Sequence, residues 1–288
     1  MKICNDAWLT LYEKNFDVSK YVYHYTNVDK AAMILSGDSL KFSKVTTMND
    51  TLESKPKIVT NELSRALVAR LIEHFKFTNN QYVQLLCFST DHPLRNKTVD
   101  RITRYTDFSG RGFSFPRMWA QYASDNNGVC FVFNKEKLKE LISNALGASL
   151  ITCGNVTYIN EYKKNIQINS DMATRLLSTL EGDIVTRSLN DVQFLRNNED
   201  FVKYNYLSKL RDWEQEREYR FVAYGANDFF VPEISKAICG VVVGEQIKPH
   251  NERILQMFCR NRFEVKKIAF YYNGCQLENI YFEDEVES

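Results

Sequence analysis

Residues 128–145 read GVCFVFNKEKLKELISNA, and this stretch indicates the class of fold. Its first part, GVCFVF, is a short and continuous apolar run, which is typical of a buried strand. Asn134 then supplies a helix cap, and the apolar residues of 135–145 recur at three- and four-residue spacing, which predicts an amphipathic helix. A buried strand that leads directly into a helix points to a fold in which both elements share one core.

The same two patterns alternate along the rest of the chain without a regular βαβ repeat. Apolar, β-branched and aromatic runs predict further strands at residues 21–25, 40–43, 83–89, 150–158, 218–224, 237–243 and 265–272. Periodic apolar residues predict further helices at 6–16, 27–35, 58–76, 118–123 and 249–259, with Asn27 as a cap, Gly37 as a stop and Pro249 in a first turn. We therefore predict an α+β fold, with a mainly antiparallel mixed sheet and flanking helices.

No linker divides the chain, which has only 5 Pro and 11 Gly among 288 residues. We therefore predict a single domain over residues 1–288. Residues 165–210 place Leu, Ile and Phe at helical spacing among charged residues, and we predict that they form a helical insertion packed on one side.

The composition narrows the class of protein. A formal net charge of +1 gives no support for a dedicated nucleic-acid binder. The 7 cysteines are scattered without any Cys-x-x-Cys, so we expect buried free thiols in a reducing compartment and no zinc site. The start of the chain lacks the apolar segment of a secretion signal, and no apolar run reaches the length of a membrane span. We expect a cytoplasmic protein with no membrane association.

Tyr23-His24-Tyr25-Thr26, at the end of the first predicted strand, carries groups that a nucleotide site uses. Alternation along a strand puts His24 and Thr26 on one face and the two tyrosines on the other. Such a histidine can hydrogen-bond ribose hydroxyls, and a tyrosine ring can stack on a flat ring. A core histidine satisfied by the backbone is the more common role, so both interpretations stay open.

The late stretch 213–220, WEQEREYR, concentrates charge at the start of a predicted strand. Glu216, Glu218 and Arg220 share one face if the strand begins by Glu216. Neighbouring carboxylates repel each other and raise one pKa, and a nearby arginine offsets the repulsion. Such a trio is expensive to bury, so it is either a solvated edge or a functional group of residues. A fixed carboxylate suits cleavage of a glycosidic bond, where positive charge builds on the sugar, and a second one can deprotonate the acceptor.

Two other regions have a structural and a functional interpretation. Trp119 and Tyr122 are three residues apart, so they share one helical face and form either core packing or a stacking wall for a cofactor ring. Asn49-Asp50 follows a predicted strand, and turn formation is its simpler role. The loop after residue 91 gathers basic residues, which form either a solvated loop or a groove for a phosphate-bearing ligand: Arg95, Lys97, Arg101, Arg104, Arg111 and Arg117.

In order and spacing these motifs resemble a bacterial and phage family known as domain of unknown function 2971. The resemblance rests on His-Tyr-Thr, Asn-Asp, Cys-Phe-Ser, Trp-x-x-Tyr-Ala, Gly-Val-Cys-x-x-Phe and Trp-x-x-Glu-x-Glu-Tyr-Arg, which run from His24 to Arg220. That family is in turn distantly similar to ADP-ribosyltransferases, which share an early strand histidine and a late Glu-x-Glu. The middle motif of those enzymes, Ser-Thr-Ser or a second Tyr, has no match here.

The resemblance implies an ADP-ribosyltransferase-like core that uses NAD as substrate and needs no metal. Glu218 is then the catalytic carboxylate and Glu216 assists the acceptor. The NAD-binding residues are then His24, Tyr25, Thr26, Trp119, Tyr122 and Arg220. Arg95, Arg101, Arg104 and Arg111 are expected to bind the substrate, a protein or nucleic-acid acceptor.

The chain is thus expected to be a transferase that cleaves the nicotinamide–ribose bond, with a use as a toxin or antiphage effector. The alternative is a non-catalytic module that binds a nucleotide or docks a partner. A serine or cysteine hydrolase is not favoured, because no Gly-x-Ser-x-Gly is present and neither His92 nor His250 has an evident nucleophile beside it.

Overall fold

The computed structural model describes residues 20–57, 63–92, 108–161, 173, 184–260, 262–272 and 274–280. Contacts group the chain into two compact units, and each unit is built from separate stretches of sequence. The first unit comprises Met1–Leu40, Phe88–Leu141 and Val231–Ser288, and the second comprises Lys41–Cys87 and Ile142–Phe230. The prediction of a single domain over residues 1–288 stays a prediction.

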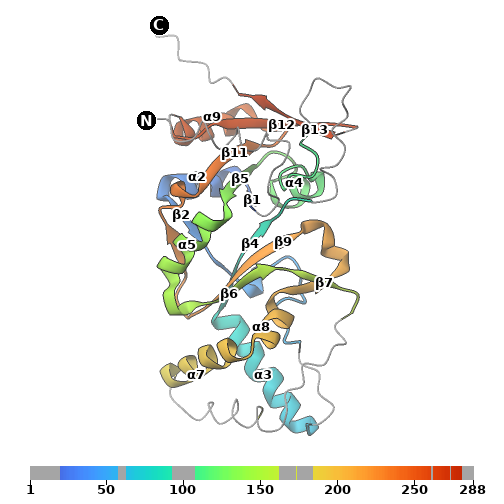
Figure 1. The fold of residues 1–288 in the computed structure, drawn as a ribbon, viewed down its shortest axis with the longest axis vertical. Coiled ribbons are helices and arrows are strands. Elements are labelled where there is room, and N and C mark those ends of the chain that lie inside the picture. Colours follow the sequence, from blue (N-terminus) through green and yellow to red (C-terminus); the bar gives the residue numbers. More distant parts are fainter. Residues whose placement is uncertain are drawn as a thin grey trace. The chain divides into compact units, whose positions relative to one another are not determined.

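The first unit is built on an antiparallel arrangement of strands with one parallel pair. Its strand order is β13-β12-β11-β5-β1, in which only β11 and β12 are parallel. Figure 1 shows β11, β5 and β1 following one another in this order. The elements that begin in this unit are β1 (Tyr21–Thr26), α2 (Val28–Gly37), β2 (Ser39–Lys41), α4 (Pro116–Tyr122), β5 (Val129–Asn134), α5 (Lys135–Leu146), β11 (Ile238–Val243), α9 (Pro249–Cys259), β12 (Val265–Tyr271) and β13 (Gly274–Asn279).

Local sequence signals set the ends of these elements. The Asn27 side chain accepts the Lys30 N–H at 2.8 Å and begins α2, and the Asn134 side chain accepts the Lys137 N–H at 3.0 Å and begins α5. Asp38 ends α2 in the left-handed region, with φ of 44°. Pro249 begins α9, because a proline in the first turn loses no helical hydrogen bond.

An aromatic core fills one face of the first unit. Tyr21, Tyr23 and Tyr25 of β1 pack with Trp119 of α4, and Val242 of β11 joins the same cluster. The alternation of β1 therefore buries its tyrosines on this face and leaves His24, which is half-buried, on the other.

The second unit also combines strands with helices. In it β4 pairs with β3 and β6 pairs with β9, both antiparallel, and β7 pairs with β8 in parallel. Its elements are β3 (Ser43–Lys44), α3 (Arg65–Gln81), β4 (Val83–Ser89), β6 (Leu150–Asn155), β7 (Thr157–Ile159), α7 (Ile184–Asn197), α8 (Glu199–Tyr206), β8 (Ser208–Leu210), a 3₁₀ turn (Arg211–Glu216), β9 (Glu218–Tyr224) and β10 (Phe230–Pro232).

Helices α3, α7 and α8 cover one face of the strands in the second unit (Figure 1). Phe75 of α3, Leu195 of α7 and Phe201 of α8 pack with Val222 of β9 in one apolar cluster. Helix α3 begins at the cap Ser64, whose side chain accepts the Leu67 N–H at 3.3 Å. The fold is α+β with a mixed, mostly antiparallel sheet, as predicted.

Several predicted elements differ from the structure. The helix predicted over 58–76 begins at Arg65 and continues to Gln81, while residues 58–62 lie outside the described residues. The region 165–210, predicted to be helical, ends in the strand β8, because Ser208–Leu210 pairs with β7. Strands β10 and β13 were not predicted. The helix predicted over 6–16 lies outside the described residues.

Candidate functional site

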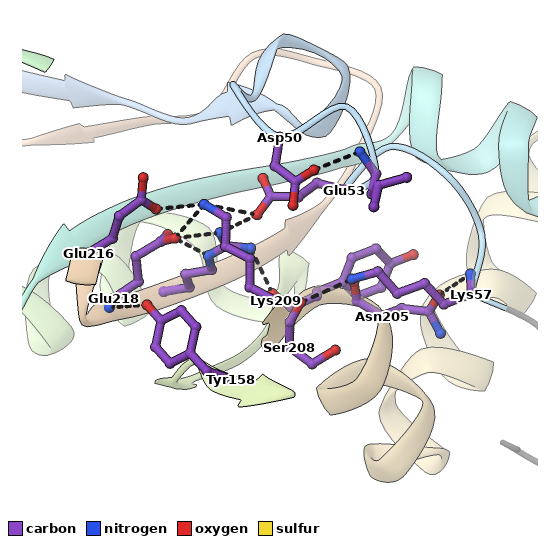
Figure 2. Close-up of polar contacts among 12 residues, drawn as sticks. Asp50, Glu53, Lys57, Tyr158, Asn205, Ser208, Lys209, Glu216 and Glu218 are labelled. Atoms are coloured by element: carbon purple, nitrogen blue, oxygen red, sulfur yellow. Dashed lines mark hydrogen bonds and ion pairs between the residues drawn. The ribbon is translucent and has the colours of Figure 1, made fainter. Parts of the chain in front are cut away.

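Five charged side chains are buried together in the second unit: Glu53, Lys209, Glu216, Glu218 and Arg220. We call these five residues the charge cluster. Glu53 lies in a turn before α3, Lys209 in β8, Glu216 in the 3₁₀ turn before β9, and Glu218 and Arg220 in β9. Figure 2 shows the side chains of Glu53, Lys209, Glu216 and Glu218 converging. Buried charges are found almost only where they are paired or functional, so this cluster is the candidate site of the unit.

Glu218 and Arg220 come from one face of β9, because alternate residues of a strand point the same way. The Arg220 guanidinium donates from Nε to Glu218 Oε2 at 2.7 Å and from Nη2 to Glu218 Oε1 at 2.8 Å. Arg220 also contacts the Glu53 carboxylate through Nη2 and the Tyr206 carbonyl through Nη1. Its planar fork thereby fixes the orientation of Glu218.

Lys209 brings the three carboxylates together. Its ammonium Nζ lies 2.6 Å from Glu216 Oε2, 2.9 Å from Glu218 Oε1 and 3.6 Å from Glu53 Oε1. Strand β8 positions this residue beside β7, where Lys209 is in register with Tyr158. The Tyr158 hydroxyl oxygen accepts the Glu218 backbone N–H at 2.9 Å, so both short strands support the start of β9.

Glu216 reaches the cluster in a different way from the one predicted. The strand begins at Glu218, and Glu216 is the last residue of the 3₁₀ turn. Arg217 between them has φ of 49°, in the left-handed region, and it redirects the chain so that Glu216 and Glu218 bind the same ammonium. The predicted proximity of Glu216, Glu218 and Arg220 is confirmed, and the strand geometry assumed for Glu216 is wrong.

Burial and pairing push the pKa values of the two carboxyls apart. Burial raises the pKa of Glu216 from 4.5 to about 7, and the neighbouring Glu218 carboxylate adds to the increase. Burial alone would also raise the pKa of Glu218, but Arg220 and Lys209 hold it well below its usual value. Glu216 is 1% exposed and Glu218 is 7% exposed. One carboxyl is therefore poised to exchange a proton near neutral pH while the other stays ionised.

The charges balance only when Glu216 is protonated. Glu53 and Glu218 then carry two negative charges against the two positive charges of Lys209 and Arg220. Burial alone would lower the pKa of Lys209, but the Glu218, Glu53 and Glu216 carboxylates raise it well above its usual value. Ionisation of Glu216 leaves the cluster with one excess negative charge, which favours a positively charged group beside it.

Two half-buried aromatic side chains adjoin the cluster. The Lys209 ammonium lies 4.3 Å from the centre of the Trp213 indole ring, a cation–π contact. Tyr158 and Trp213 are both only partly covered, in contrast to the charged groups that they flank. Tyr158 contacts the backbone of Glu218, and Trp213 contacts the lysine that binds both carboxyls.

Glu53 and Lys209 were missed by the sequence analysis. Glu53 belongs to the turn that starts at Asn49-Asp50, where the Asp50 side chain accepts the Leu52 N–H at 2.9 Å. That contact confirms the turn interpretation of Asn49-Asp50. Nothing in the local sequence links Glu53 to residues 209–220, and Lys209 lies in a segment predicted to be helical. In the sequence Lys209 is an ordinary lysine between Ser208 and Leu210, at the end of the helical pattern, and no local signal marks it.

The predicted NAD-binding residues of the first unit differ in how deeply their side chains are buried. Trp119 is 0% exposed, its indole N–H donates to the Phe113 carbonyl at 2.7 Å, and its ring meets Tyr25 edge-on. The buried Tyr25 hydroxyl donates to the Gly112 carbonyl at 2.6 Å. These contacts favour core packing for both rings, while Tyr122 is half-buried.

Thr26 is buried at the end of β1, and the half-buried His24 ring lies 5.6 Å from the ring of Phe88. His24 belongs to the first unit and Glu218 to the second. The meeting of these two residues at one site stays a prediction.

The predicted basic groove is described only in part. Arg95, Lys97, Arg101 and Arg104 lie outside the described residues. Arg111 is 1% exposed, and its Nη1 lies 3.3 Å from Asp91 Oδ2. Burial raises the pKa of Asp91 to about 6, and Arg111 opposes the increase. Arg111 therefore lies in the interior in this structure and does not line an exposed groove.

Among the described residues, no group of three or more His, Cys, Asp or Glu side chains is arranged to hold a metal ion. Within the same part of the chain, no helix combines the length and the apolar character needed to cross a membrane.

Comparison with known proteins yields one family match. Residues 118–221 match the model of a family described as a protein of unknown function (DUF2971). The matched stretch begins in α4 and ends in β9, so it contains Lys209, Glu216, Glu218 and Arg220, and it supports the resemblance to that family. No curated protein matches the chain, and no solved structure matches it.

Proposed function

We propose that the protein is an NAD-dependent ADP-ribosyltransferase with Glu218 as the catalytic carboxylate and Glu216 as the general base. One observation carries the proposal: two buried carboxyls, two residues apart, bind the same Lys209 ammonium at 2.9 and 2.6 Å. Paired carboxyls in different protonation states are the usual means of cleaving a glycosidic bond. The ADP-ribosyltransferase-like core belongs to this proposal as well.

The charge of the site suits this reaction. Breaking the nicotinamide–ribose bond leaves positive charge on the ribose, and NAD itself carries a positively charged nicotinamide ring. An ionised Glu218, held rigid by Arg220, stabilises that charge without having to reorient. The excess negative charge of the cluster after ionisation of Glu216 acts in the same direction.

The proposed step balances as a substitution at the ribose carbon. The carbon–nitrogen bond breaks, and nicotinamide leaves as a neutral molecule with the bonding electron pair. The acceptor nucleophile forms the new bond to the same carbon and gives its proton to the Glu216 carboxylate. A pKa of about 7 suits Glu216 to this role near neutral pH.

The rest of the site remains part of the proposal. His24 and Thr26 hold the NAD ribose, Tyr122 is the predicted ring contact that is not fully buried, and Arg95, Arg101 and Arg104 bind the acceptor, a protein or a nucleic acid. The proposed setting is a bacterial or phage cytoplasm, and the proposed use is as a toxin or antiphage effector.

Release of nicotinamide from NAD by the purified protein tests the proposal. Glu218→Gln is expected to reduce the rate by on the order of 10²–10⁴-fold. Glu214→Gln is the matched control, because Glu214 is exposed, lies in the 3₁₀ turn just before β9 and has an ion pair with Arg211 of 3.8 Å. Equal rates for the wild-type protein and folded Glu218→Gln would remove Glu218 from the mechanism.

A second candidate is a non-catalytic module that binds a nucleotide or docks a partner. It is favoured by the mutual pairing within the charge cluster, where Glu53 and Glu218 already neutralise Lys209 and Arg220. A self-neutralised network can act as a rigid framework without any chemistry. Binding of NAD without release of nicotinamide, unaffected by Glu218→Gln, would select this candidate.

A further inference from the structure

We infer that Lys57 is a positioning residue for the carboxyl pair, because it joins the turn that carries Glu53 to the segment that carries Lys209. This inference deepens the proposed function and rests on it where catalysis is concerned. Lys57 itself touches no reacting atom in the proposed step. Its contribution is to hold two sides of the charge cluster at a fixed separation.

Three hydrogen bonds form the link, and Figure 2 shows them beside the charge cluster. The Lys57 ammonium donates to the carbonyl oxygens of Asn205 and Ser208, each at 3.0 Å. The Lys57 backbone N–H donates to Asn205 Oδ1 at 2.9 Å. We call this set of contacts the Lys57 clasp.

Each end of the clasp leads to a member of the charge cluster. On one side, Lys57 lies four residues after Glu53, which the turn at Asp50 places against Arg220 and Lys209. On the other side, Ser208 is the residue before Lys209, and Asn205 is anchored to α8 through its side-chain amide, which donates to the Phe201 carbonyl at 3.1 Å. Loss of the clasp therefore loosens Glu53 and Lys209 together.

Burying the charged Lys57 side chain costs free energy, which the contacts of the clasp must offset. Lys57 is 7% exposed, and lysines are almost never buried unless they are paired or functional. Burial lowers its pKa from 10.5 to about 8, while Glu53 and Asp50 oppose the decrease. A lysine ammonium with no structural role in this turn would have a lower free energy in water than in the interior.

Two possible roles of Lys57 predict opposite changes in the pKa of Glu216 when Lys57 is replaced. If Lys57 contributed only its positive charge, removing it would raise the pKa of the Glu216 carboxyl. If Lys57 keeps the cluster closed, removing it admits water and weakens two opposing effects: burial, which raises the Glu216 pKa, and the Lys209 contact, which lowers it. Burial is the largest of the causes that shift this pKa, so the net change lowers it toward 4.5. The direction of the change therefore separates positioning from simple electrostatics.

The test is a ¹³C NMR titration of the Glu216 side-chain carboxyl in the folded full chain, assigned by the resonance lost in Glu216→Gln. Lys57→Met is expected to lower the midpoint by about one unit or more. Asn205→Ala keeps the Lys57 charge but removes the Oδ1 contact, and it is expected to shift the midpoint in the same direction by a smaller amount. Lys41→Met is the matched control, because Lys41 is half-exposed and pairs with Asp228.

A raised or unchanged midpoint in Lys57→Met, or an unchanged midpoint in Asn205→Ala, would overturn the inference. If Lys57→Met does not fold, the Asn205→Ala titration decides the matter alone. The titration needs no NAD, so a wild-type protein without nicotinamide release would reject the proposed function and leave the clasp open to the same test. In an active protein, the pH midpoint of kcat/KM is expected to move with the NMR midpoint.

Discussion

Arg220 holds the Glu218 carboxylate through two hydrogen bonds, of 2.7 Å from Nε and 2.8 Å from Nη2. This two-point contact fixes the plane of the carboxylate as well as its distance. A carboxylate fixed in this way presents its negative charge in one direction, which is what stabilisation of a developing positive charge requires.

Replacing Arg220 by lysine keeps the charge and removes the fork. Arg220→Lys is expected to lower the free energy of unfolding by about 2–4 kcal/mol, because the buried Glu218 carboxylate loses one of its two bonds to residue 220 and the Tyr206 carbonyl loses a donor. Urea denaturation measures the change. Arg211→Lys, on the exposed Arg211, is the control and should stay within about 0.5 kcal/mol of the wild-type value. Equal losses in the two variants would contradict the argument.

Because the pKa of Glu216 is raised in the folded state, the contribution of Glu216 to the free energy of unfolding decreases as pH rises. The folded state binds the proton more tightly than the unfolded state, since the pKa rises from 4.5 to about 7 on folding. The contribution of Glu216 is fully present below about pH 4.5 and is lost as pH rises through 7. The difference in unfolding free energy between wild type and Glu216→Gln is therefore expected to change by about 2 kcal/mol between pH 5 and pH 8, to the disadvantage of the wild type at pH 8.

That difference is obtained from denaturant titrations of both proteins at several pH values. Titrating groups that do not contact Glu216 cancel in the comparison, because only residue 216 differs between the two chains. A difference that is constant from pH 5 to pH 8, or one that grows in favour of the wild type, would show that the Glu216 pKa is not raised.

A second buried network in the second unit ties α3, α7 and β9 together. Asp191 lies 3.1 Å from His74 Nε2 and accepts a hydrogen bond of 2.7 Å from the Tyr224 hydroxyl. Tyr224→Phe is expected to lower the free energy of unfolding by about 1–2 kcal/mol, because Asp191 stays buried with one partner fewer. Tyr271→Phe, at a half-exposed ring, should change stability by less than about 0.5 kcal/mol. Thermal unfolding of both variants makes the comparison.

Gly244 allows a close approach of two backbone segments in the first unit. A Cβ atom there would lie 2.0 Å from the Asn126 carbonyl oxygen, which ends a run of three left-handed residues, Ser124, Asp125 and Asn126. Gly244→Ala is expected to cost about 3 kcal/mol or more, since neither backbone can move freely. Gly147 has a positive φ of 50° but open space around it, so Gly147→Ala should cost only about 1 kcal/mol. Chemical denaturation that ranks the two variants in the reverse order would contradict the steric argument.

Local patterns predicted the elements well where the deciding residues are neighbours in sequence. The caps Asn27 and Asn134 and the first-turn Pro249 act over three or four residues, and the structure confirms them. The strand β8 was missed because its three residues follow a helix directly and owe their conformation to pairing with β7. The two compact units were not anticipated, since the chain passes between them within β2, β4, α5 and β10 and leaves no linker to recognise.

The candidate site could be predicted only in part for a related reason. Glu216, Glu218 and Arg220 were found because they lie within five residues of one another in sequence. Glu53 and Lys57 complete the site through contacts across more than a hundred residues of chain, which local patterns cannot reveal. Lys209 lies only seven residues before Glu216, and it was missed because its segment was predicted to be helical. Arg217 has a left-handed backbone, and this conformation brings the Glu216 and Glu218 carboxyls to the same lysine.

Strand β5 has consequences for synthesis of the chain on the ribosome. It pairs with β1 on one side and with β11 on the other, where Phe131 is opposite Val241. The second edge of β5 therefore stays unpaired until the ribosome has released residues 238–243, while both segments of the other unit end by residue 230. An apolar strand exposed during translation is a template for wrong pairing. Premature termination before residue 238 should thus yield aggregates, even though the charge cluster has been translated in full.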